Sequence, residues 1–140
     1  MPDERIAALA AGLRGKGERL TPARRQVLTT LAQSDHHLTA EEVLTEVQAQ
    51  TANVHRATVY RTLETLSRLG IVEHTHLGHG PAVYHLADDA HHHLVCEACG
   101  RIVEVPVTLF RTVERRLRDE YDFVMRARHF AVVGRCRACA

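Results

Sequence analysis

The sequence predicts an α+β fold in two parts, with a winged helix-turn-helix domain over residues 1–86 and an α/β domain over residues 91–140. Three patterns support this prediction: apolar residues recur at helical spacing in the first half, alternating runs follow the last of these helices, and two Cys-x-x-C pairs lie in the second half. The polar segment 87–90 is the predicted hinge. A chain of 140 residues is long enough for one domain or two small ones.

Four segments of the first half have the spacing of helices. Two of them begin at a threonine: Thr21 precedes Pro22, and Thr39 opens the capping-box pattern Thr39-Ala40-Glu41-Glu42. A break over 51–55 precedes the last segment, which ends at Gly70. The expected apolar stripes are, in order, Ile6, Leu9 and Leu13; Val27, Leu28 and Leu31; Val43, Leu44 and Val47; and Val59, Leu63, Leu66 and Leu69.

The last two of these segments are two helices joined by a short turn, which is typical of a helix-turn-helix. The apolar stripe of the second helix leaves Arg56, Tyr60 and Arg61 facing outward. Residues 71–76 and 82–86 then form two short runs around a glycine-containing turn, which predicts a β-hairpin, the wing.

In the second half, strands are predicted over 92–96 and 101–105, on either side of the first Cys-x-x-C pair. An amphipathic helix is predicted over 107–121. A last strand over 129–133 precedes the second pair.

The four cysteines predict a structural zinc site. Cys96 and Cys99 form one pair and Cys136 and Cys139 the other, with 36 residues between the pairs. Two such pairs can bind one zinc ion tetrahedrally. Disulfides, a redox switch and free thiols are the alternatives, although thiols in the cytoplasm are kept reduced.

Charge and hydropathy restrict the class of protein. The net charge of +1 does not by itself indicate nucleic-acid binding, but residues 14–25 carry a local excess of basic side chains. No apolar run approaches the roughly 20 residues needed to span a bilayer. The acidic start has no cleavable apolar core, so we expect no signal peptide and a cytoplasmic protein.

Eleven histidines in 140 residues point to metal binding. His91 and His93 are two apart on a predicted strand and share a face, whereas His92 points the other way. His74 and His76 have the same spacing in the hairpin, where exposed polar side chains are the simpler explanation. His36, His55 and His79 are expected to be surface residues.

Four segments in this order resemble the ferric uptake regulator (Fur) family of metal-dependent repressors. The resemblance implies a homodimeric winged-helix repressor whose second half dimerises and whose bound metal sets its affinity for double-stranded operator DNA. It implies no membrane and no small-molecule substrate as partners. The matching segments are Arg19-Leu20-Thr21-Pro22, Ala57-Thr58-Val59-Tyr60-Arg61-Thr62-Leu63, His91-His92-His93-Leu94-Val95-Cys96-Glu97-Ala98-Cys99-Gly100 and Gly134-Arg135-Cys136-Arg137-Ala138-Cys139.

The resemblance also implies a regulatory metal site with ligands from both halves, formed by His37, His85, His91, His93 and Glu104. His85 stands where relatives carry a carboxylate, and Glu104 replaces the aspartate typical of the peroxide-sensing branch. The departure from the pattern of that branch argues against a peroxide sensor, since hard carboxylate ligands favour iron or manganese.

Within the family, the chain is most similar to the nickel uptake regulators. His74, His76 and His129 match the positions of their nickel site. Imidazole ligands suit nickel or copper better than iron, and they also suit zinc. The zinc-sensing branch uses a cysteine distal to the wing as a metal ligand, whereas this chain has no cysteine before Cys96. We therefore expect nickel as the regulatory metal, with iron, manganese or zinc as alternatives; His129 could instead bind a backbone carbonyl.

The resemblance further implies which residues contact DNA. Tyr60 is expected to touch a thymine methyl group in the major groove, and Arg61 the backbone or a base. Nearer the N-terminus, Lys16 and Arg19 are expected to reach phosphates or the minor groove, and a solvated basic face is the alternative there. Phosphate contacts would provide affinity but no sequence preference. The full set of expected DNA-binding residues is Lys16, Arg19, Arg56, Thr58, Tyr60 and Arg61.

Two other classes of protein fit the sequence less well. A zinc enzyme needs an open coordination position and a nearby base, whereas four cysteines leave no open position. The motifs H-E-x-x-H and H-x-E with P-C-x-x-C are absent from the sequence. A metal-buffering protein would not need a helix-turn-helix. We therefore expect no enzymatic activity.

Overall fold

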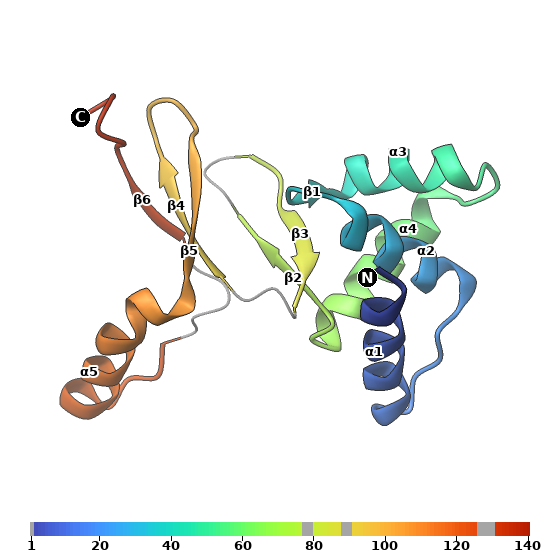
Figure 1. Cartoon of the computed structure of the whole chain (residues 1–140), viewed down its shortest axis with the longest axis horizontal. Coiled ribbons are helices and arrows are strands. Elements are labelled where there is room, and N and C mark those ends of the chain that lie inside the picture. The colour runs from blue at the N-terminus through green and yellow to red at the C-terminus, as the bar shows by residue number, and fades with distance from the viewer. Residues whose placement is uncertain (1, 77–79, 88–90, 126–130) are drawn as a thin grey trace. The chain divides into compact units, whose positions relative to one another are not determined.

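The computed structural model describes residues 2–76, 80–87, 91–125 and 131–140 (Figure 1). The chain divides into two compact units. The first unit comprises Met1–His74 and Ala82–Asp88, and the second comprises Thr75–Pro81 and Asp89–Ala140. The segment Thr75–Pro81 thus groups with the second unit, although the sequence boundaries place it in the first. Most of the predicted hinge, residues 88–90, lies outside the described residues.

Four helices form most of the first unit: α1 (Pro2–Gly15), α2 (Pro22–Gln33), α3 (Ala40–Gln50) and α4 (Arg56–Arg68). Two of them begin as predicted. The hydroxyl of Thr21 accepts a hydrogen bond from the Arg24 backbone N–H, and that of Thr39 accepts one from the Glu42 N–H, each at 3.2 Å. Within the described residues, no helix is long and apolar enough to cross a membrane.

The core of the first unit consists of the predicted apolar stripes. Every stripe residue is buried except Leu69, which is partly buried and packs against the core. Leu13, Leu28 and Val59 are fully inaccessible to solvent. Burying a side chain of this size stabilises a fold by about 1.5–3 kcal/mol, so this unit holds together through its own apolar contacts.

A small sheet completes the first unit, with β1 (Leu38–Thr39), β2 (Val72–Thr75) and β3 (Val83–Leu86) in the order β1-β3-β2. The two longer strands are the predicted hairpin. The two-residue strand β1 was not predicted, because it is too short to show alternation and exists through its antiparallel pairing with β3.

The second unit contains β4 (His91–Cys96), β5 (Ile102–Pro106) and β6 (Ala131–Gly134) in the order β5-β4-β6, with α5 (Arg111–Tyr121) following β5 (Figure 1). β5 is antiparallel to β4, and β6 is parallel to it. The predicted helix 107–121 is divided: Val107–Phe110 form the 3-10 helix η1, and only the remainder is α-helical.

Few of the apolar residues that the structure describes in the second unit are buried. Val95 and Cys96 are less than a tenth exposed, and their buried neighbours His92 and His93 are polar. Many large apolar side chains of this unit face solvent instead, namely Ile102, Leu109, Val113, Tyr121, Phe123, Val124, Val132 and Val133. The described part of this unit therefore has little hydrophobic core of its own.

Candidate metal centres and nucleic-acid interface

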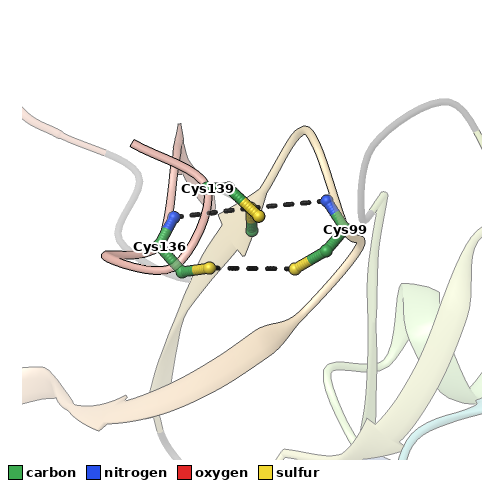
Figure 2. Close-up of side chains that lie close together, drawn as sticks. Cys99, Cys136 and Cys139 are labelled. Atoms are coloured by element: carbon green, nitrogen blue, oxygen red, sulfur yellow. Dashed lines mark hydrogen bonds between the residues drawn. The ribbon is translucent and has the colours of Figure 1, made fainter.

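The four cysteines come together in the second unit, as the sequence predicts. Their sulfur atoms all lie within 4.8 Å of one another, and the Sγ atoms of Cys99 and Cys136 face each other at 3.8 Å (Figure 2). Cys96 is the last residue of β4 and Cys99 lies in the turn that follows, whereas Cys136 and Cys139 lie in the segment after β6. The parallel pairing of these strands, with Cys96 opposite Gly134, brings the two turns together.

The chemistry of this cluster suits a metal ion. The backbone N–H groups of Cys136 and Cys99 donate to the Cys96 sulfur at 3.4 and 3.5 Å and lower the pKa of that thiol to about 6. Hydrogen bonds with the other three cysteines raise the pKa of Cys139 to about 12. Four thiolates this close would repel each other strongly, and a divalent cation removes that repulsion. All four are free cysteines, and their arrangement fits a tetrahedral zinc site.

A second group of metal-ligating side chains lies on the same sheet. The Nε2 atoms of His91 and His93 are 3.0 Å apart, and the His91 Nε2 atom is 3.5 Å from a carboxylate oxygen of Glu104. The β4–β5 register explains this grouping, since His93 is directly opposite Glu104. The ring of His92 instead contacts the ring of Phe110 in a T-shaped arrangement, with ring centroids 5.0 Å apart. The predicted alternation of these three histidines is confirmed.

The first unit contains a further histidine pair. The rings of His37 and His85 are stacked with centroids 4.4 Å apart. His85 also lies 3.3 Å from a carboxylate oxygen of Glu73, and both side chains are less than a tenth exposed. Glu73 was not predicted as a site residue, because a single glutamate in a hairpin strand is ordinarily solvent-exposed.

The expected nickel ligands can be followed only in part. His74 is half-buried on β2, with its ring 6.0 Å from that of Tyr84, and His76 is exposed just after this strand. His129 and also His79 lie outside the described residues.

The expected DNA-binding residues are largely exposed. On α4, the side chains of Arg56, Tyr60 and Arg61 face solvent, while Thr58 is half-buried. Lys16 and Arg19 are also exposed, in the segment between α1 and α2. A nearby carboxylate, Glu41 on α3, contacts two of the α4 side chains. Glu41 was not predicted as a site residue, since the sequence pattern assigned it only to a capping box.

Known proteins resemble the chain over nearly its whole length. Residues 15–132 match the ferric uptake regulator family. The ferric uptake regulation protein of Bacillus subtilis is 32% identical over 98% of this chain and 95% of its own length. The peroxide-responsive repressor PerR of Staphylococcus aureus is 30% identical over 92% of this chain and 87% of its own.

Solved structures agree with these matches. The ferric uptake regulator of Pseudomonas aeruginosa, solved with manganese, has a TM-score of 0.75 at 28% identity. The match covers 91% of this chain and 96% of the Pseudomonas aeruginosa chain. The Helicobacter pylori regulator has a TM-score of 0.77 at 20% identity, covering 99% and 93%, and supports the fold alone. The chain therefore belongs to the ferric uptake regulator family, whose members are metal-responsive transcription regulators and not enzymes.

Proposed function

We propose that this protein is a repressor that binds double-stranded operator DNA as a homodimer when it is loaded with nickel. The observation that carries this proposal is the pair of histidine groups, His37 with His85 in one unit and His91 with His93 in the other. Zinc bound by the four cysteines has a structural role. Because a repressor has to reach its operator, the proposal includes the expected cytoplasmic location.

The regulatory metal binds to ligands from both units, His37, His85, His91, His93 and Glu104. A carboxylate oxygen of Glu104 is 3.5 Å from the His91 Nε2 atom, which supports Glu104 as the negatively charged ligand of the metal cation. A metal that needs ligands from both units favours one arrangement of the two. A difference on the order of 3–5 kcal/mol between arrangements suffices to switch DNA binding.

The prevalence of imidazole ligands supports nickel as the regulatory metal. His74, His76 and His129 form a second nickel site in this proposal. The relatives named above are ferric uptake and peroxide regulators, and the carboxylates of Glu73 and Glu104 are hard ligands that iron and manganese prefer. Iron, manganese and zinc are therefore the alternatives that the experiment has to separate.

Helix α4 reads the operator in the major groove through Tyr60 and Arg61, with Arg56 and Thr58 beside them. The exposed, basic Lys16 and Arg19 contact phosphates. The apolar side chains that the second unit exposes, such as Val133, support dimerisation through that unit, because a soluble monomer rarely exposes so many.

Retention of genomic DNA fragments tests this proposal. The zinc-loaded protein is mixed with a fragment library and nickel, Fe(II), manganese, additional zinc or a chelator, and the bound fragments are sequenced. We expect enrichment with nickel. Stronger enrichment with Fe(II), manganese or zinc would make that metal the regulator, and no enrichment with any metal would contradict the repressor function.

Variants then locate the site. We expect His91→Ala/His93→Ala to abolish metal-dependent retention, and His74→Ala/His76→Ala to abolish the nickel response while the zinc content stays unchanged. His36→Ala, which removes an exposed histidine, is the matched control. If the His74→Ala/His76→Ala variant still responds to nickel, the second nickel site is wrong.

A further inference from the structure

Three charged or polar side chains meet where the first turns of α3 and α4 approach each other. The carboxylate of Glu41 on α3 forms an ion pair with the Arg56 guanidinium. The Tyr60 hydroxyl donates a hydrogen bond to the same carboxylate oxygen, Oε1, at 2.5 Å. The Arg56 guanidinium also lies 5.8 Å from the centre of the Tyr60 ring.

Rigid elements fix this arrangement. The Thr39 cap and the buried Val43 and Val47 hold α3 in place, and the buried Val59 and Leu63 hold α4. Glu41 lies in the first turn of α3, where the helix dipole favours a negative charge. The packing of α3 thus fixes the position of the Glu41 carboxylate, which points to the exposed side of α4.

The three groups shift one another's pKa values. The hydrogen bond from Tyr60 and then the Arg56 guanidinium lower the pKa of Glu41. The same carboxylate raises the pKa of Tyr60 and of Arg56. Glu41 is therefore ionised, and the other two protonated, throughout the physiological range.

Fold stability does not explain this cluster. The side chains of Glu41 and Arg56 are 58% and 62% exposed, and exposed ion pairs add little to stability. A carboxylate beside groups that face DNA should also repel phosphates. Charge alone therefore predicts that removing Glu41 would strengthen DNA binding.

We propose that Glu41 is a positioning residue that holds Arg56 and Tyr60 in the conformation that reads the operator. This rests on the proposed function of α4 in DNA binding. Free arginine and tyrosine side chains lose rotamer freedom when they bind, whereas side chains that are already ordered lose less. Glu41 thereby favours operator DNA, which needs the correct geometry, over other DNA, which needs only positive charge.

The specificity ratio, operator affinity divided by affinity for a scrambled duplex of the same length and composition, tests this role. The operator is the fragment recovered by retention, and binding is measured by fluorescence anisotropy on metal-loaded protein. We expect Glu41→Ala to lower the ratio roughly 5- to 10-fold, while binding to the scrambled duplex stays the same or tightens. Glu41→Gln keeps an oxygen that accepts from Tyr60, and we expect it to retain part of the ratio.

Glu42→Ala is the matched control, because it removes the same charge from the same helical turn. Glu42 is near His36, at 3.9 Å, rather than in the cluster, so we expect its ratio to stay at the wild-type value. In a double-mutant cycle, Tyr60→Phe should cost much less specificity in the Glu41→Ala background than in the wild type. Thermal unfolding verifies that each variant is folded.

Two outcomes would overturn the proposal, and they differ in what else they overturn. If Arg56→Ala and Tyr60→Phe weaken operator binding but Glu41→Ala behaves like Glu42→Ala, Glu41 is only a surface charge and the function of α4 stands. If Arg56→Ala and Tyr60→Phe leave operator binding unchanged, the DNA-reading role of α4 is wrong and the role of Glu41 is wrong with it.

Discussion

The two units of this protein are stabilised in different ways. The first unit has a closed apolar core with contributions from four helices and a small sheet. Over its described residues, the second unit buries few apolar side chains and leaves many large ones exposed, and its four cysteines lie together at the end of its sheet.

In our proposal, this contrast separates the unit that reads DNA from the unit that depends on bound metal. A unit with its own core keeps its shape whatever binds elsewhere, which suits a DNA-reading surface that has to stay fixed. A unit that lacks such a core depends on what it binds, namely a structural metal and, in our proposal, a second copy of the chain. Three experiments test this difference between the units.

The largest expected effect is the loss of the zinc site. Structural zinc contributes about 10 kcal/mol or more to the folding of small zinc domains. We expect Cys136→Ser, or a strong chelator, to unfold the second unit and leave the first folded. Hydrogen exchange followed by mass spectrometry would show this as lost amide protection in β4, β5 and α5, with α2 and α4 still protected.

Ala138→Ser is the control for this experiment, because it makes a similar change between the two cysteines and leaves all four ligands in place. We expect it to keep full protection. Protection of β4 and β5 that survives complete zinc removal would mean that the second unit folds without metal, and the contrast between the units would fail.

A smaller effect is expected from a cavity in the core of the first unit. Leu63 is 1% exposed, and replacing a buried leucine by alanine costs about 2–5 kcal/mol. We expect Leu63→Ala to lower the free energy of unfolding of the first unit by this amount, measured from its amide protection in urea. The neighbouring surface change Glu64→Ala should stay within about 0.5 kcal/mol of wild type. Equal destabilisation of β4 and β5 would show that the units unfold together.

What the sequence predicted well is determined locally or by simple periodicity. Helix starts at Thr21 and Thr39 depend on residues three positions away, and the four apolar stripes follow from helical spacing. The cysteine pairs were identifiable as a zinc site because few other sites need two Cys-x-x-C pairs.

What it missed depends on contacts between distant segments. β1 exists through its pairing with β3, and the parallel pairing of β6 with β4 has no local pattern. The proximity of Glu73 to His85, and of Glu41 to Tyr60, likewise appears only after folding. The first turn after Pro106 winds as a 3-10 helix, which apolar spacing does not distinguish from an α-helix.

The smallest expected effect concerns a helix cap, which is determined locally and also differs between the two units. Thr39 caps α3 through its hydroxyl, whereas no side-chain hydrogen bond caps the start of α5 in the second unit. Losing a threonine cap costs about 0.5–2 kcal/mol, so we expect Thr39→Ala to destabilise the first unit by that amount in urea unfolding. Thr45→Ala makes the identical change within α3, where the hydroxyl only donates to the Glu41 carbonyl. Because alanine is the better helix former, this control should be neutral or slightly stabilising; equal losses in the two variants would mean that the cap does not stabilise α3.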